Sequence, residues 1–67
     1  MTLQINGKQV ELPDNVNSVK KLLLHYKLES RIAVVELNKE IVKKEEYEKR
    51  KLVNGDTLEI VHFIGGG

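Results

Sequence analysis

Hydrophobic and polar residues alternate near the start of the chain, on both sides of the dipeptide Asn6-Gly7. The alternating hydrophobic positions are Leu3, Ile5, Val10 and Leu12. Alternation is typical of strands with one buried face, and Asn-Gly favours the type I′ turn of a hairpin because both residues tolerate a positive φ. This segment is therefore predicted to form a β-hairpin. Pro13 is expected to end it, since proline has no N–H to donate to a strand ladder.

The spacing of the hydrophobic residues then changes to intervals of three and four. The residues on this stripe are Val19, Leu22, Leu23 and Tyr26. Such spacing places them on one face of a helix, and Asn15, Asn17 and Ser18 precede it as candidate N-cap residues. We predict one helix of about ten residues, packed on a sheet by this stripe, with Leu28 closing its C-terminal end.

Three further strands are predicted in the second half of the chain. Residues 31–37 are apolar on both sides, as expected for a central strand that is covered on both faces or paired on both edges. Asn38-Lys39 then forms a turn into residues 40–42, and Asn54-Gly55-Asp56 forms a turn into a last strand at about 57–62. In that last strand the core-facing residues are Leu58 and Ile60, and the others are Glu59, Val61 and Phe63.

The charged segment 43–51 is expected to form a loop with one helical turn, anchored by Tyr47. The order of elements is then strand, strand, helix, strand, strand, strand. A hairpin, a crossover helix and a final strand beside the first define the β-grasp or ubiquitin-like arrangement. We predict an α+β fold of this type, with one main helix packed on a mixed sheet of four or five strands. Residues 1–64 would form this domain and residues 65–67 a flexible glycine tail.

The composition limits how such a domain can be stabilised. The chain has 67 residues, of which 40% are hydrophobic, with no cysteine and only two histidines. Domains of this size often use disulfides or a metal. Without cysteine, a disulfide framework, an iron–sulfur cluster and a thiolate zinc site are all excluded. Packing is expected to provide the stability, and no metal site is predicted.

Charge and hydropathy exclude two further classes of partner. Eleven basic and ten acidic residues give a net charge of +1, which is too balanced for nonspecific nucleic-acid binding. No apolar run exceeds three or four residues, so neither a signal peptide nor a membrane span is predicted. We expect a cytoplasmic protein that binds neither nucleic acid nor membrane.

The last three residues, Gly65, Gly66 and Gly67, are the feature that packing does not explain. Glycine buries no side chain and has a large backbone entropy to lose. One interpretation is a frayed or cloning-derived end. The other is an arm that carries the carboxylate of Gly67 into another protein's active site, through a channel that a Cβ would obstruct. A carboxylate is a poor electrophile and needs activation, for example as an acyl-adenylate. The chain lacks a phosphate-binding loop, so the activating enzyme would be a separate protein.

The residues before the glycines are candidates for contact with that partner. They are Val61, His62, Phe63 and Ile64. Phe63 would either cap the core or be gripped by the partner. His25, which lies off the helix stripe, is expected at the surface. No nucleophile is paired with a base, so no catalytic residue is predicted and the chain is not expected to be an enzyme.

Four motifs follow one another in the second half of the chain: residues 31–42, Glu45-Glu46-Tyr47, residues 54–61 and the closing glycines. In this order they resemble the ThiS family, the sulfur carriers of thiamin biosynthesis. Lys39 departs from that family, which often has glycine in this turn. The resemblance implies that a ThiF-type adenylyltransferase adenylates Gly67 with ATP and Mg, and that the adenylate becomes a thiocarboxylate. A sulfur donor such as a cysteine desulfurase relay would supply the sulfur, and the thiazole synthase ThiG would receive it.

Two alternatives stay open at this point. The small subunit of molybdopterin synthase also ends in diglycine, although those chains tend to be longer and to have a proline before the tail, where this one has His62-Phe63-Ile64. That subunit is the MoaD-like alternative. The other alternative is a non-carrier β-grasp binding module, such as a nucleotide- or RNA-associated accessory domain, in which the glycines are incidental. Loss of the last two glycines would inactivate a carrier but not a binding module.

Overall fold

A hairpin opens the chain, as its alternating pattern predicts. In the computed structural model, which describes residues 1–63, β1 (Thr2–Ile5) pairs antiparallel with β2 (Lys8–Glu11). Asn6 and Gly7 have φ values of 50° and 83°. Both central residues of the turn therefore lie in the left-handed region, as a type I′ turn requires.

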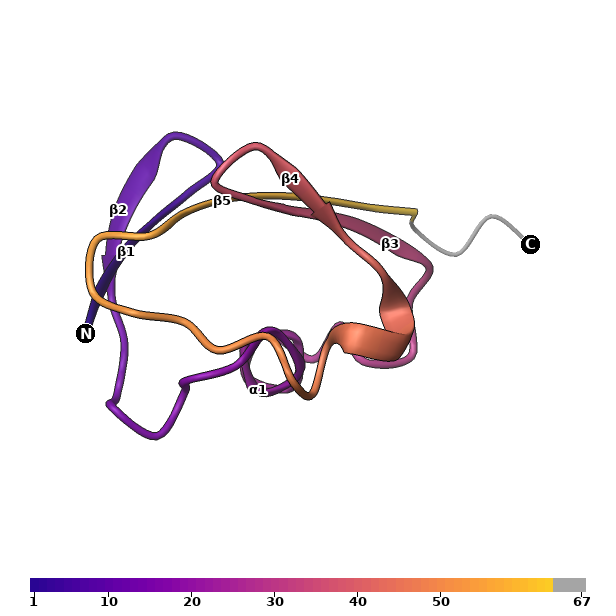
Figure 1. Ribbon diagram of the computed structural model, residues 1–67, viewed down its shortest axis with the longest axis horizontal. Helices are drawn as coiled ribbons and strands as arrows, with labels where there is room; N and C mark the ends of the chain where they lie inside the picture. Colours follow the sequence, from indigo (N-terminus) through magenta and orange to yellow (C-terminus); the bar gives the residue numbers. More distant parts are fainter. Residues whose placement is uncertain (64–67) are drawn as a thin grey trace.

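Five strands form one mixed sheet in the order β2-β1-β5-β3-β4 (Figure 1). The remaining strands are β3 (Ala33–Leu37), β4 (Glu40–Val42) and β5 (Thr57–His62). β5 pairs parallel with β1 and antiparallel with β3, so the last strand lies beside the first. This is the predicted β-grasp arrangement, with five strands.

Helix α1 (Val19–His25) packs on one face of this sheet. The hydroxyl oxygen of Ser18 accepts a hydrogen bond from the Lys21 N–H at 3.1 Å, which identifies Ser18 as the N-cap among the three candidates. At the other end the Leu28 N–H donates to the Leu23 carbonyl at 2.8 Å, while Lys27 has a φ of 61°. These features form a Schellman motif, and Leu28 closes the helix as predicted.

The prediction for Tyr26 was wrong. The helix ends at His25 and is seven residues long, shorter than expected. Because Tyr26 is its C-cap, the chain turns away from the helix axis there, and the side chain is 41% exposed instead of buried on the stripe.

The hydrophobic core lies between the helix and the sheet. Its buried residues are Leu3, Leu12, Val16, Val19, Leu22, Leu23, Val35, Leu37, Val42, Leu52, Leu58 and Ile60. β3 is paired on both edges, as predicted, but only one of its faces is covered: Val35 is fully buried and Val34 is 44% exposed. Of the two explanations offered for its two-sided apolar pattern, pairing on both edges is confirmed and cover on both faces is not, because the one α-helix of the described part covers one face.

The charged segment contains a short 3-10 helix, η1 (Lys44–Glu46), close to the predicted helical turn. Tyr47 follows it, packs against the core and donates from its hydroxyl to the Ala33 carbonyl at 3.4 Å. The role of Tyr47 as the anchor of this segment is confirmed.

The side chain of Asn6 extends the pairing between β1 and β5. Backbone pairing of these strands ends at Ile5 and Leu58. Beyond it, the Asn6 side-chain oxygen accepts from the Ile60 N–H at 2.8 Å, and its amide donates to the Ile60 carbonyl at 3.1 Å. This side chain therefore holds β5 in place just before its C-terminal end.

We predict that Asn6→Ala lowers the free energy of unfolding by about 2 kcal/mol, because both polar groups of Ile60 lose their partner. Chemical denaturation measures this loss, and hydrogen exchange at the Ile60 amide should accelerate. Asn6→Asp keeps the acceptor and should cost less. Gln9→Ala, at an exposed position of β2, is the control, and an equal loss for Asn6→Ala and Gln9→Ala would contradict the role assigned to Asn6.

Candidate functional site

The C-terminal end of β5 is the candidate functional site. β5 runs through the centre of the sheet, and it ends at the opposite end of the molecule from the N-terminus (Figure 1). The Phe63 N–H donates to the carbonyl of Ile32, the residue directly before β3, at 3.0 Å. The backbone is thus held one residue beyond His62, two residues before the first glycine of the predicted arm.

Strand alternation separates the residues predicted to contact a partner. Val61 and Phe63 lie on the face away from the helix and are 58% and 61% exposed, so Phe63 does not cap the core. His62 lies on the other side and is half-buried. Ile64 and the glycines Gly65, Gly66 and Gly67 lie outside the described residues. Their roles, and partner binding at this end, stay predictions.

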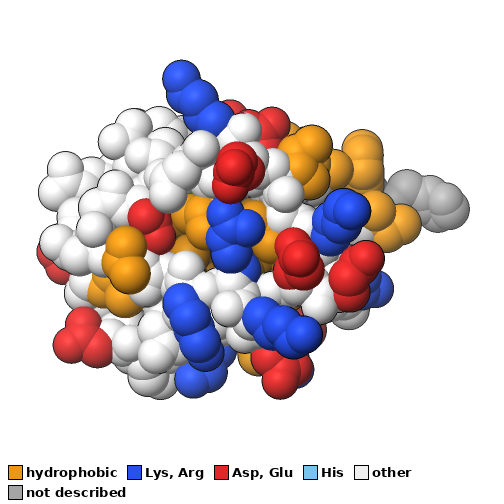
Figure 2. Space-filling model, viewed as in Figure 1, with side chains coloured by type: hydrophobic (Ala, Val, Ile, Leu, Met, Phe, Trp, Pro, Cys, Tyr) orange, Lys and Arg blue, Asp and Glu red, His pale blue; other side chains and the backbone are white. Residues whose placement is uncertain are grey.

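Val61 and Phe63 belong to a larger exposed apolar surface, which we call the outer patch. Its members are Ile32, Val34, Ile41, Val61 and Phe63, which are 44% to 74% exposed. Val34 lies directly opposite Val61, and Phe63 is bonded to Ile32. Figure 2 shows hydrophobic side chains gathered beside the C-terminal end. Contiguous apolar surface of this kind marks an interaction site.

Sequence reasoning missed three members of the outer patch: Ile32, Val34 and Ile41. The apolar character of Ile32 and Val34 was attributed to a central strand that is covered on both faces or paired on both edges, and Ile41 was assigned only to the following strand. The number of elements was the signal that could have revealed them, because a single helix covers only one face of a five-stranded sheet. Any apolar residue whose side chain points to the uncovered face must then contact solvent or a partner.

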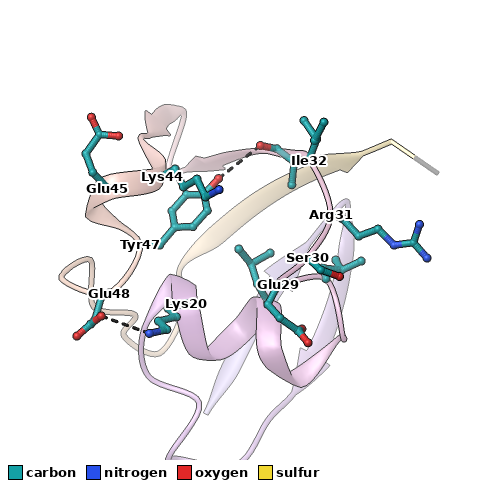
Figure 3. A pocket seen from close by; sticks show the side chains of 12 residues that line it. Lys20, Glu29, Ser30, Arg31, Ile32, Lys44, Glu45, Tyr47 and Glu48 are labelled. Carbon is teal, nitrogen blue, oxygen red and sulfur yellow. Dashed lines mark hydrogen bonds and ion pairs between the residues drawn. The ribbon is translucent and has the colours of Figure 1, made fainter. Parts of the chain in front are cut away.

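A hollow of about 480 Å³ lies between α1, the segment before β3 and η1 (Figure 3). Lys20 and Glu48 form an ion pair of 3.3 Å at its rim, and Tyr47 forms one wall. The side chains of Arg31 and Glu45 point away from it in Figure 3. The lining holds neither histidine nor cysteine.

A second hollow of about 450 Å³ lies on the helix side of the sheet and is lined by His62 and Tyr26 together with mostly apolar residues. Nδ1 of His62 is buried and has no hydrogen-bond partner among residues 1–63. Lys8 also belongs to the lining. A histidine without a neighbouring nucleophile or carboxylate does not form a catalytic pair. His25 is exposed, as predicted, and its ring meets the Tyr26 ring edge-on, at 5.2 Å between centroids.

Within residues 1–63, no group of three or more His, Cys, Asp or Glu residues is placed to hold a metal ion. No helix in the described range is both long and apolar enough to cross a membrane.

Comparisons with known proteins agree with this geometry. The sequence model of the ThiS family matches residues 3–67, up to the last glycine. The sulfur carrier protein ThiS of Bacillus subtilis (strain 168) is 48% identical over 65 residues, which cover 97% of this chain and 98% of that protein. The crystal structure of the thiamine biosynthesis protein ThiS from Geobacter metallireducens superposes with a TM-score of 0.82 at 32% identity, and the match covers 100% of both chains.

A further relative is a much longer protein. The thiazole synthase of Paramagnetospirillum magneticum (strain ATCC 700264 / AMB-1) is 43% identical over 67 residues. That match covers 100% of this chain but only 20% of the synthase.

Proposed function

The chain belongs to the ThiS family, and on that premise we propose that it is a sulfur carrier of thiamin biosynthesis, loaded at the carboxylate of Gly67. The observation that carries the proposal is the family match, which continues through the glycines to residue 67. The position of β5 supports it, since the strand leads the chain to one end of the molecule and its backbone is held as far as Phe63. The glycines that follow would form the arm that enters another protein.

The proposed loading takes two steps on the partner. A carboxylate oxygen of Gly67 attacks the α-phosphorus of ATP, and pyrophosphate leaves, which gives the acyl-adenylate. A sulfur nucleophile then attacks the carbonyl carbon and AMP leaves, so that a C–S bond replaces a C–O bond. ATP and Mg bind to the ThiF-type enzyme and not to this chain. A sulfur donor such as a cysteine desulfurase relay provides the sulfur. Where the attacking nucleophile is the outer sulfur of the donor's persulfide, the product is an acyl disulfide, and a thiol must then attack the donor-side sulfur, which forms a disulfide with the donor and releases the thiocarboxylate of Gly67.

The thiazole synthase is the proposed recipient of the sulfur. In the Paramagnetospirillum magneticum protein, a region that matches this whole chain is part of the synthase polypeptide itself. Linking two binding partners in one chain raises their effective concentration without any new contact. The fused arrangement therefore supports functional binding between this chain and the thiazole synthase where the two are separate chains.

Of the families weighed from the sequence, the one that matches is ThiS. No observation favours the small subunit of molybdopterin synthase or a β-grasp module with incidental glycines.

Mass spectrometry of the intact protein tests the proposal. The chain is incubated with its ThiF-type enzyme, ATP, Mg and a sulfur source, and we expect one oxygen to be replaced by sulfur. Fragmentation should locate the change at Gly67. A reaction with a non-hydrolysable ATP analogue that blocks attack at the α-phosphorus is the control. An unchanged mass despite confirmed ATP turnover would overturn the proposal.

A further inference from the structure

Two glutamates face each other across the middle of the sheet. Glu36 on β3 lies directly opposite Glu59 on β5 in the antiparallel register. Both belong to the outer face, where Glu59 is exposed and Glu36 is half-buried. Neither carboxylate has a hydrogen-bond or ion-pair partner among residues 1–63, whereas Glu40 and Glu48, for example, are each paired with a basic side chain.

This arrangement does not help the domain to fold. Like charges directly opposite each other on neighbouring strands destabilise a sheet. Threonine or valine at either position would remove the repulsion and would suit a strand better than glutamate does. The pair of glutamates therefore either interacts with another molecule or is a destabilising contact that nothing in the sheet compensates.

The surroundings of the pair favour an interaction with another molecule. Ile41 on β4 lies opposite Glu36 on its other side, and Val34 and Val61 form the next outward-facing pair along the same two strands. The two carboxylates thus border the outer patch. When a protein covers the patch, water leaves the neighbourhood of the carboxylates and electrostatic interactions there become stronger. A cation placed between them would relieve their repulsion, and a guanidinium can bond to both because its donors are fixed in a plane.

We infer that Glu36 and Glu59 bind an arginine of the thiazole synthase between their carboxylates, while apolar side chains of that enzyme cover the outer patch. We call this pair of glutamates the anionic clamp. The identity of the enzyme rests on the proposed function. The outer patch continues to Phe63, two residues before the first glycine of the predicted arm, so an enzyme that receives Gly67 is expected to cover this end of the sheet. The synthase is the occupant that the relative from Paramagnetospirillum magneticum supports, because there both parts share one chain.

The test measures binding of the full chain to purified thiazole synthase by calorimetry at low and high salt. The double variant Glu36→Gln/Glu59→Gln should bind about tenfold more weakly at low salt, and its affinity should depend less on salt, because a close charge pair is lost. The control is Glu11→Gln/Asp14→Asn, which removes the same charge near the N-terminus, where Asp14 pairs with the terminal amine. It should bind like the wild type.

Thermal unfolding separates this effect from a loss of structure. Removing one pair of facing like charges should leave the Tm of the double variant unchanged or raise it by roughly 2 °C. A protein at least as stable that binds its partner less well identifies a binding role and not a structural one.

Three outcomes would overturn the clamp. The double variant could bind the synthase like the wild type, the control could weaken binding equally, or the double variant could lose only its rate of adenylation, which would assign the pair to the activating enzyme. In each of these cases the wild type still binds the synthase and acquires sulfur. A wild type that does neither would instead refute the proposed function, and the clamp with it.

Discussion

Removal of Gly66 and Gly67 should abolish sulfur loading while leaving the free energy of unfolding unchanged. The two deleted residues span about 7 Å of extended chain, so the carboxylate of the shortened protein would stop well short of the reacting phosphorus. The buried hydrophobic residues of the described part all lie between Leu3 and Ile60, so the deletion removes none of the side chains that stabilise the core. Intact-mass analysis after incubation with the activating enzyme measures loading, and chemical denaturation measures stability.

Gly65→Ala is the matched control for this deletion. It keeps the length of the arm, the terminal diglycine and the carboxylate of Gly67, and the Cβ it adds stands two residues before that carboxylate, so it should lose less of the loading than the truncated chain. Full loading of the truncated chain would show that the reacting group is elsewhere. A fall in stability equal to the fall in loading would show that the glycines belong to the folded domain.

Leu58→Ala should leave much of the protein unfolded at 37 °C. Leu58 is fully buried in β5, where it lies opposite Ile5 on one side and Leu37 on the other. Truncating such a leucine costs about 2–5 kcal/mol, from lost burial and from the cavity that remains. A single core of this size supplies only about 3–5 kcal/mol. We expect the Tm, measured by circular dichroism, to fall by more than about 10 °C.

Val61→Ala in the same strand is the control for Leu58→Ala. Its side chain is 58% exposed on the outer face, so its loss should change the free energy of unfolding by less than about 0.5 kcal/mol. Equal destabilisation by both substitutions would contradict the assignment of β5 to a sheet with one buried and one open face.

The turns of this fold are predictable from the sequence because short-range chemistry fixes them. Asn6-Gly7 and Asn38-Lys39 both adopt positive φ values, and Lys39 keeps the turn at a φ of 70° although it stands where glycine is common in the family. Asn38 also binds the start of β5: its side-chain oxygen accepts from the Thr57 N–H at 3.0 Å. That contact joins residues far apart in the sequence, so a local pattern contains no sign of it.

The end of the helix was harder to predict, for a local reason. A Schellman motif usually has glycine at the position of left-handed conformation, and here Lys27 occupies it. Because no glycine marks the end of the helix, the periodic pattern extends through Tyr26 and predicts a helix that is too long. The closing contact of Leu28 was predictable because a hydrophobic residue there commonly packs against the last turn.

The candidate site was predictable in one part and not in another. Val61 and Phe63 follow from the alternation of a single strand, and the structure places both at the surface. The rest of the outer patch and the facing glutamates depend on which strands are neighbours. Glu36 and Glu59 become a pair only once β5 is inserted between β1 and β3, and periodicity within one strand does not specify that insertion.

The central position of β5 has a consequence for how the chain folds as it is made. β5 is the last of these strands to leave the ribosome, yet it separates the hairpin β1–β2 from the pair β3–β4 in the finished sheet. Until it emerges, the two halves of the sheet have no common neighbour, and the contacts that join them span most of the domain, which slows folding. A nascent chain interrupted before Thr57 would lack the strand that unites the sheet and would remain a target for proteases. Cells would thus degrade incomplete copies before any of them competes with finished ones for the enzymes of the pathway.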